Sequence, residues 1–215
     1  MKYTPLPKEL YQRNRAKFAA KMAKNGVAIF NANDILPTNA DGTMKFRQNN
    51  DLFYLCGIDQ EETILLLAPD CPNPAWREVL FLRETNAHIA VWEGHKYTKE
   101  EAFAASGIEN IQWLSSFDLI FNSVVNLAER IYLNSNEHLR AGVVVETRDA
   151  RFIQVVKERY PLHRLERAAP ILHALRAVKE SEEIQQLQIA WDITEKGFRR
   201  VLGMVQPGVT EYEIE

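Results

Sequence analysis

Short apolar runs separated by polar turns most constrain what this chain of 215 residues can fold into. They are long enough for buried strands and too short for core helices. Segments with helical spacing lie between several of them. Strands that alternate with helices predict an α/β fold, a mixed β-sheet flanked by helices. The predicted strands are residues 27–30, 63–68, 79–82, 89–92, 131–133 and 143–145.

Caps and breakers mark the predicted helices. The first carries Leu10 and Phe18 on one face, with Pro7 in its first turn and Gly26 as its C-cap. A capping box at Thr98 starts a short helix that ends at Gly107. Two more helices are predicted over residues 117–128 and 149–160.

A long amphipathic pattern follows Pro170, with Ser181 as its predicted N-cap. Near the end of the sequence given, residues 210–213 form a second capping-box pattern, which predicts the start of another helix. A one-turn helix cannot stabilise itself, so we expect the natural protein to continue. We therefore predict two domains, residues 1–173 and residues 174–215, the second being the beginning of a truncated domain.

Composition excludes several partners. The net charge is −3 and no basic face stands out, so we expect no nucleic-acid partner. The longest clean apolar run, residues 64–68, is too short to cross a membrane, and the first residues lack the apolar core of a signal peptide. Cys56 and Cys71 form no CxxC pair and favour reduced thiols in a cytoplasmic protein.

No self-contained catalytic motif is present. None of the five histidines has HExxH spacing, and there is no GxSxG, Walker A or GxGxxG motif. His88 and His95 could approach each other, but a metal needs three or four converging ligands. We therefore expect no catalytic residue and no metal site within this chain.

Polar residues run directly into an apolar segment in the stretch FRQNNDLFYLCG, residues 46–57. Arg47 and Asp51 are four residues apart and could pair if the segment is helical. The amides of residues 48–50 could saturate backbone groups around a buried turn. These residues favour a structural corner over direct catalysis. Taken alone, Trp92 reads as packing at a strand end and Asp41 as an Asx-turn.

Residues Arg47–Gly57 resemble the RQNxDFxYxxG signature of the N-terminal domain of Xaa-Pro aminopeptidases, also called aminopeptidase P. Residues 91–94 resemble that family's W-x-G corner. Residues 176–184 resemble the opening of its catalytic domain, and residues 207–214 its PGxTExEI segment. These later segments also resemble prolidases and creatinases.

The resemblance implies a non-catalytic N-terminal domain that shapes one wall of the active site and builds a homo-oligomer. The family's chemistry belongs to a C-terminal pita-bread domain, where two Asp, one His and two Glu hold two metal ions, usually manganese. A metal-bridging hydroxide attacks the peptide bond before proline. The intact protein is then expected to release the first residue of peptides with proline second, while this chain alone is inactive.

Four residues acquire expected roles from the resemblance. Trp92 matches a tryptophan that reaches toward the substrate pocket of a neighbouring subunit. Asp41 matches an acid that braces arginines of the catalytic domain, and Arg47 and Asp51 are also expected to brace domains. Two other readings stay open: a metal-free pseudo-peptidase that binds peptides, and a creatinase or prolidase relative. The ligand set of the catalytic domain would discriminate among them.

Overall fold

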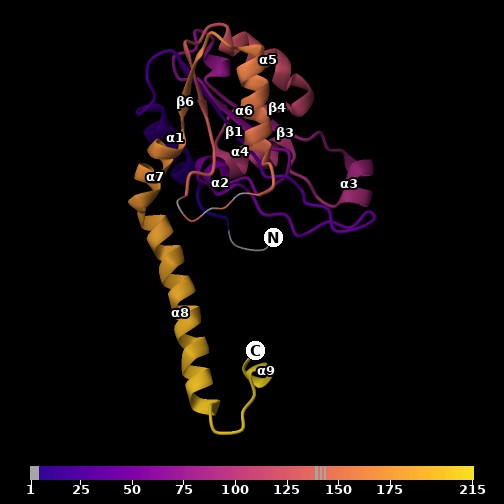
Figure 1. Cartoon of the computed structure of the whole chain (residues 1–215), viewed down its shortest axis with the longest axis vertical. Helices are drawn as coiled ribbons and strands as arrows, with labels where there is room; N and C mark the ends of the chain where they lie inside the picture. Colours follow the sequence, from indigo (N-terminus) through magenta and orange to yellow (C-terminus); the bar gives the residue numbers. More distant parts are fainter. Residues whose placement is uncertain (1–4, 139, 141, 143) are drawn as a thin grey trace. The chain divides into compact units, whose positions relative to one another are not determined.

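The computed structural model describes residues 5–138, 140, 142 and 144–215. Within it the chain divides into two compact units, residues up to Ala177 and Val178–Glu215. The first unit is built on a six-stranded sheet with the order β4-β3-β2-β1-β5-β6 (Figure 1). The strands are β1 (Gly26–Asn31), β2 (Ile64–Leu67), β3 (Glu78–Leu82), β4 (Asn110–Trp113), β5 (Arg130–Leu133) and β6 (Arg164–Arg167).

Strand β2 runs against all the others. It is antiparallel to both of its neighbours, β1 and β3. The pairs β1–β5, β5–β6 and β3–β4 are parallel. The predicted mixed sheet flanked by helices is therefore confirmed. The carboxyl ends of β1, β5 and β6 consequently lie at one edge of the sheet.

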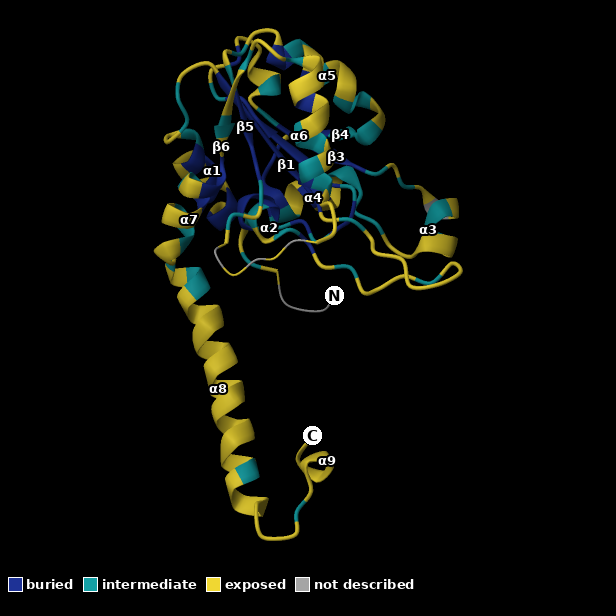
Figure 2. Cartoon of the chain, in the orientation of Figure 1, coloured by how far each residue is buried: buried dark blue, intermediate teal, exposed yellow. Residues whose placement is uncertain are grey.

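Helices cover both faces of the sheet (Figure 1). Along β1, Ala28 and Phe30 join the core under α1, α2, α4 and α7, while Val27 and Ile29 join the core under α5 and α6. Figure 2 shows the central strands β1 and β5 as buried and the edge strand β6 as partly exposed. These helices are α1 (Lys8–Ala19), α2 (Asn50–Cys56), α4 (Lys99–Ser106), α5 (Phe117–Val125), α6 (Arg148–Arg159) and α7 (Ala169–Ala177).

A buried cation ties several elements together. Arg15 of α1 is 1% exposed. Its Nη1 donates to the carbonyls of Leu55 at 2.9 Å and Ser106 at 3.0 Å, in the last turns of α2 and α4. Its Nε donates to Glu78 Oε2 on β3 at 2.9 Å. These bonds satisfy helix carbonyls that have no partner within their own helices, and they offset the desolvation of the guanidinium.

The polar-to-apolar stretch forms helix α2 and its flanking turns. Asn49 is the N-cap, and its side chain accepts from the N–H groups of Asp51 and Leu52. Gly57 ends the helix with a φ of 70°, a left-handed conformation that favours glycine. A Cβ there would also lie 2.3 Å from the Tyr11 ring, so this close approach requires glycine.

Two predicted strands are wrong. Residues 89–92 belong to helix α3 (Ala87–Glu93), because Asn86 caps it by accepting from the N–H groups of His88 and Ile89. The cap overrides the β-branched composition of the segment. Val144 and Val145 are exposed and outside any strand, while Val143 lies outside the described residues.

The end of the first helix and two strands also differ from the predictions. The first helix ends at Ala19, and Gly26 begins β1 instead of capping that helix. Strands β4 and β6 were not predicted from their residues. Both are edge strands in the sheet order, with partly exposed side chains. The charged residues of β6 are typical of a protected sheet edge, and they hide the strand from a search for apolar runs.

The second unit consists of α8 (Ser181–Met204) and α9 (Glu211–Ile214). The N-cap of α8 is Glu180, not Ser181, and it forms a capping box with Glu183. The predicted capping box of Thr210 and Glu213 is present. One stripe of α8 is apolar and exposed: Ile184, Leu187, Trp191, Phe198 and Leu202. The structural division falls after Ala177, a few residues beyond the predicted one.

Candidate functional site

A polar cleft of about 630 Å³ opens where the carboxyl ends of β1 and β5 meet. Its walls are the residues after β1, the start of α2, the loop after β5, the start of α6 and two residues of α7. In open α/β sheets, ligand sites commonly lie at the carboxyl ends of the parallel strands. The cleft is therefore the candidate site of the first unit.

The corner formed by Gln48 and Asn49 is fixed by side-chain hydrogen bonds. Gln48 Nε2 donates to the carbonyls of Ile58 at 2.9 Å and Gln60 at 2.8 Å. Gln48 Oε1 accepts from the Asn49 N–H at 2.8 Å. Gln48 is 9% exposed, so these bonds satisfy buried backbone groups. The predicted structural corner is confirmed.

Asp51 links three elements at the cleft. Its Oδ1 lies 2.5 Å from Nη1 of Arg176 on α7, and its Oδ2 accepts from Asn134 Nδ2 at 3.1 Å. Arg47 lies before α2, and within the described ranges no ion pair joins it to Asp51, although the spacing of the two residues allowed one. The ion pair with Arg176 instead joins the start of α2 to the end of the first unit.

Asp149, in the first turn of α6, is the most perturbed carboxyl of the cleft. It is 8% exposed and accepts from Asn31 Nδ2 at 2.9 Å. Asn49 Nδ2 lies 3.5 Å from its other oxygen. Burial raises the pKa of Asp149 to about 7, and the nearby charge of Asp51 adds to the rise. Near neutral pH this carboxyl can therefore hold or release a proton.

The structure separates the four residues expected to act at the site. Asp51 lines the cleft, whereas Asp41, Arg47 and Trp92 are not among its lining residues. Asp41 is exposed in the loop closed by the Pro37–Thr43 bridge. The carbonyl of Arg47 accepts from Asn33 Nδ2 at 2.9 Å. Trp92 is 80% exposed on α3.

Several cleft residues were missed by sequence reasoning. Asn31 and Asn134 each lie where a buried strand meets the cleft, and Asp149 follows the helix cap Thr147. A polar residue at the carboxyl end of a buried strand was the available signal. It carries little weight alone, because such residues also serve as ordinary turn or cap residues.

Manganese does not fit the residues present. Among the described residues, no three His, Cys, Asp or Glu side chains are grouped to hold a metal ion. His95 Nε2 instead lies 3.2 Å from Glu101 Oε2, and the His88 N–H donates to the cap Asn86. No step of a reaction is therefore assigned to a metal held by this chain.

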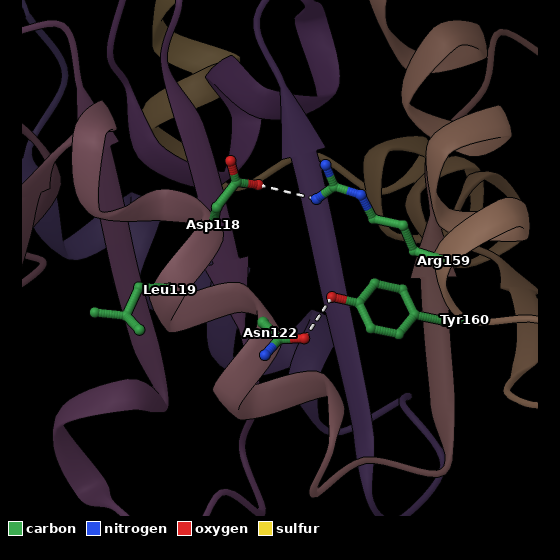
Figure 3. A pocket seen from close by; sticks show the side chains of 5 residues that line it. All are labelled: Asp118, Leu119, Asn122, Arg159 and Tyr160. Carbon is green, nitrogen blue, oxygen red and sulfur yellow. Dashed lines mark hydrogen bonds and ion pairs between the residues drawn. The ribbon is translucent and has the colours of Figure 1, made fainter.

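A second hollow lies between α5 and α6 (Figure 3). Its polar side chains bond to one another. Arg159 Nη1 lies 3.3 Å from Asp118 Oδ1, and the Tyr160 hydroxyl donates to Asn122 Oδ1 at 3.1 Å. Because these groups are paired and exposed, the hollow is a weaker candidate than the cleft.

Comparison with known proteins decides the family. Residues 11–132, more than half of the chain, match the family model described as aminopeptidase P, N-terminal domain. The chain belongs to this family. Its relatives include the Xaa-Pro aminopeptidases of Escherichia coli and Haemophilus influenzae, each 24% identical over 98% of this chain. The match covers 48% of the first and 46% of the second.

Solved structures agree with the family assignment. A Bacillus anthracis protein described as an aminopeptidase P is 26% identical, with a TM-score of 0.87 over 97% of this chain and 49% of that one. Aminopeptidase PepP of Pseudomonas aeruginosa, at 23% identity and a TM-score of 0.80, shares the fold. The chain thus spans about half the length of the curated relatives it matches.

Across the described ranges, each helix is either too short or too polar to cross a bilayer.

The raised pKa of Asp149 predicts a pH-dependent stability. The folded state binds this proton more tightly than the unfolded state, so the free energy of unfolding falls as pH rises from about 4 to about 7. Each pKa unit corresponds to about 1.4 kcal/mol. Asp149→Asn keeps the acceptor for Asn31 without the charge. We compare the free energy of unfolding of the variant with that of the unmodified chain. We expect the difference, variant minus unmodified, to be more favourable to the variant at pH 8 than at pH 5 by about 2 kcal/mol or more.

Urea unfolding of both proteins at the two pH values measures this difference. Asp118→Asn, at an exposed position on α5, is the matched control and should leave the pH profile unchanged. Parallel pH profiles for the Asp149 variant and the unmodified chain would show that Asp149 is not the responsible group.

Proposed function

We propose that this chain is the N-terminal portion of a metal-dependent Xaa-Pro aminopeptidase. The observation that carries the proposal is the alignment of 98% of the chain with 48% of the E. coli Xaa-Pro aminopeptidase. The reaction is the release of the first residue from peptides whose second residue is proline. Peptides of that type are the proposed substrates.

The proposed metal site lies outside residues 1–215. Two manganese ions would be held by carboxylate and histidine ligands of a catalytic domain that begins within residues 174–215. Two facts support this division. The described residues hold no group of metal ligands, and the chain covers about half of its relatives. One solved E. coli aminopeptidase P is zinc-substituted and bound to product, which supports a metal in the complete enzyme.

The first unit is proposed to form a rigid wall of the active site in a homo-oligomer. Trp92 supports this role because a tryptophan that is 80% exposed has little to stabilise within its own short helix. Asp41 and Arg47, both exposed, are proposed to contact the catalytic domain, and Asp51 to brace α7 through Arg176. Cys56 and Cys71 are buried free thiols, which supports a cytoplasmic location.

Activity and metal content of two proteins test the division of labour. The full-length protein with manganese should cleave peptides that carry proline second. The purified chain of 215 residues should neither cleave them nor bind manganese stoichiometrically, because its described residues hold no group of metal ligands. Titration calorimetry and a peptide-cleavage assay measure the two properties. Tight metal binding or proline-dependent cleavage by the chain would contradict the assignment, as would an inactive full-length protein.

Substitution of Trp92 tests the active-site wall in the full-length enzyme. We expect Trp92→Ala to lower kcat/KM on peptides of four or more residues by about tenfold, as for a buried aromatic contact in an interface. Dipeptides should be affected much less, because they do not reach the neighbouring subunit. Val91→Ala, on the same helix and 76% exposed, is the control. Equal effects on long and short substrates would remove the proposed role.

A further inference from the structure

Helix α3 stands apart from the helices that cover the sheet (Figure 1). It consists of Ala87–Glu93 and carries Trp92 near its end. Among residues 88–93, whose burial the structure describes, no side chain is buried. A helix this short is only marginally stable by itself. Its position therefore depends on contacts made by the residues at its two ends. We call residues 83–97 the α3 arm.

The carboxyl end of the α3 arm is anchored on the turn formed by residues 60–62. Lys96 pairs with Glu61, and the two side chains are 15% and 9% exposed. The Tyr97 N–H donates to Gln60 Oε1 at 2.7 Å. Removal of one partner of a buried ion pair leaves the other charge uncompensated, so this anchor resists separation.

The amino end of the α3 arm is anchored on the same turn through Arg83. This residue follows β3 directly, and extension of the antiparallel β2–β3 register places it opposite Glu62. Arg83 Nε lies 3.6 Å from Glu62 Oε2, and Arg83 Nη2 donates to Glu93 Oε1 at 2.7 Å. One guanidinium therefore joins the turn to the last residue of α3.

Backbone strain at Glu62 points to a role for its side chain. Its φ is 57°, a left-handed conformation that favours glycine and strains a residue with a Cβ. The side chain is 44% exposed, so it gains little from burial. Strained residues cluster at functional sites, where the surrounding structure holds them. The carboxylate of Glu62 faces Arg83, and this contact gives the strain a function in holding the α3 arm.

Arg83 is the anchor that can be removed without unfolding the first unit. Its side chain is 35% exposed, and ion pairs this accessible contribute little to the stability of a whole domain. Loss of its contacts should leave the sheet folded and let α3 shift. A side chain that occupies its binding position for a smaller fraction of the time binds correspondingly more weakly. The contacts of Arg83 thus bear on how well Trp92 can bind.

We propose that the turn of residues 60–62 sets the position of the α3 arm, and that Arg83 is a positioning residue for Trp92 when the enzyme binds long peptides. Arg83 acts through Trp92 and not on the substrate. The inference rests on the proposed function, in which Trp92 contributes to the substrate pocket of a neighbouring subunit. It extends that function to substrate length, because the preference for long peptides then depends on how firmly the α3 arm is held.

A double-mutant cycle in the full-length enzyme tests the proposal. Arg83→Met should lower kcat/KM on peptides of four or more residues by about threefold to fivefold, and on dipeptides by less than about 1.5-fold. In the Trp92→Ala background the same substitution should change either value by less than about 1.5-fold, because the side chain that it positions is absent.

Arg130→Met is the matched control in the same assays. Arg130 on β5 pairs with Glu166, and that glutamate is 36% exposed, as is Glu93 in the pair with Arg83. The control should keep the peptide-length preference of the unmodified enzyme. Equal losses on long and short peptides in Arg83→Met, or a loss that persists in full without Trp92, would overturn the proposal.

Hydrogen exchange of the chain of 215 residues measures the anchoring without an activity assay. The N–H groups of Ala90 and Gly94 donate to carbonyls one turn earlier and report the opening of α3. Both should exchange at least about threefold faster in Arg83→Met and in Glu62→Gly, and at an unchanged rate in Arg130→Met. Glu62→Gly also relieves the left-handed backbone, so the free energy of unfolding of the chain should not fall.

The two experiments separate this inference from the proposed function. Unchanged exchange in both Arg83→Met and Glu62→Gly would refute the anchor. Faster exchange in an active enzyme whose peptide-length preference does not change would refute the positioning role of Arg83 and leave the proposed function intact. A full-length protein that cleaves no peptide with proline second would contradict the proposed function, and with it the positioning role.

Discussion

The hydrogen bonds of the Gln48 side chain fix the geometry on which the rest of the first unit depends. One amide holds both sides of a turn, since Gln48 Nε2 donates to Ile58 and Gln60 and Oε1 accepts from Asn49. Asn49 then caps α2 and places Asp51 in the cleft. Gln60, on the other side of the turn, accepts from the Tyr97 N–H through its side-chain oxygen. The corner therefore connects α2 to the loop before α4.

Arg15 of α1 stabilises the carboxyl end of α2, which follows this corner. Its bonds to the carbonyls of Leu55 and Ser106 join the carboxyl ends of α2 and α4 to α1. A buried guanidinium is destabilising unless its donors are satisfied, and here three acceptors meet it. This arrangement gives the first unit a rigid frame. The proposed role as a wall of the active site requires such rigidity.

The central strands were predictable because both of their faces are buried. Strands β1, β2, β3 and β5 appear in the sequence as continuous apolar runs, which is typical of strands covered by helices on both faces. Edge strands β4 and β6 lack this signal. The apolar residues of α3 resemble those of a strand, although Asn86 caps a helix there.

The candidate site was only partly predictable. The corner at Gln48 and Asn49 follows from amides placed before an apolar run. The partner of Asp51 does not, because Arg176 is 125 residues away in the chain. The pKa of Asp149 depends on burial and on Asp51, neither of which is local in sequence. Long-range contacts of this kind come from the topology of the sheet.

The free energy of unfolding of two variants in the corner tests the central claim most directly. Gln48→Met conserves the size of the side chain and removes its donors and acceptor, so buried carbonyls lose a partner. We predict a loss of about 2–4 kcal/mol in urea unfolding. Asn50→Ala, at an exposed position two residues later, should lose less than about 0.5 kcal/mol. Equal, small losses in the two variants would show that the polar residues of this corner do not hold the structure together.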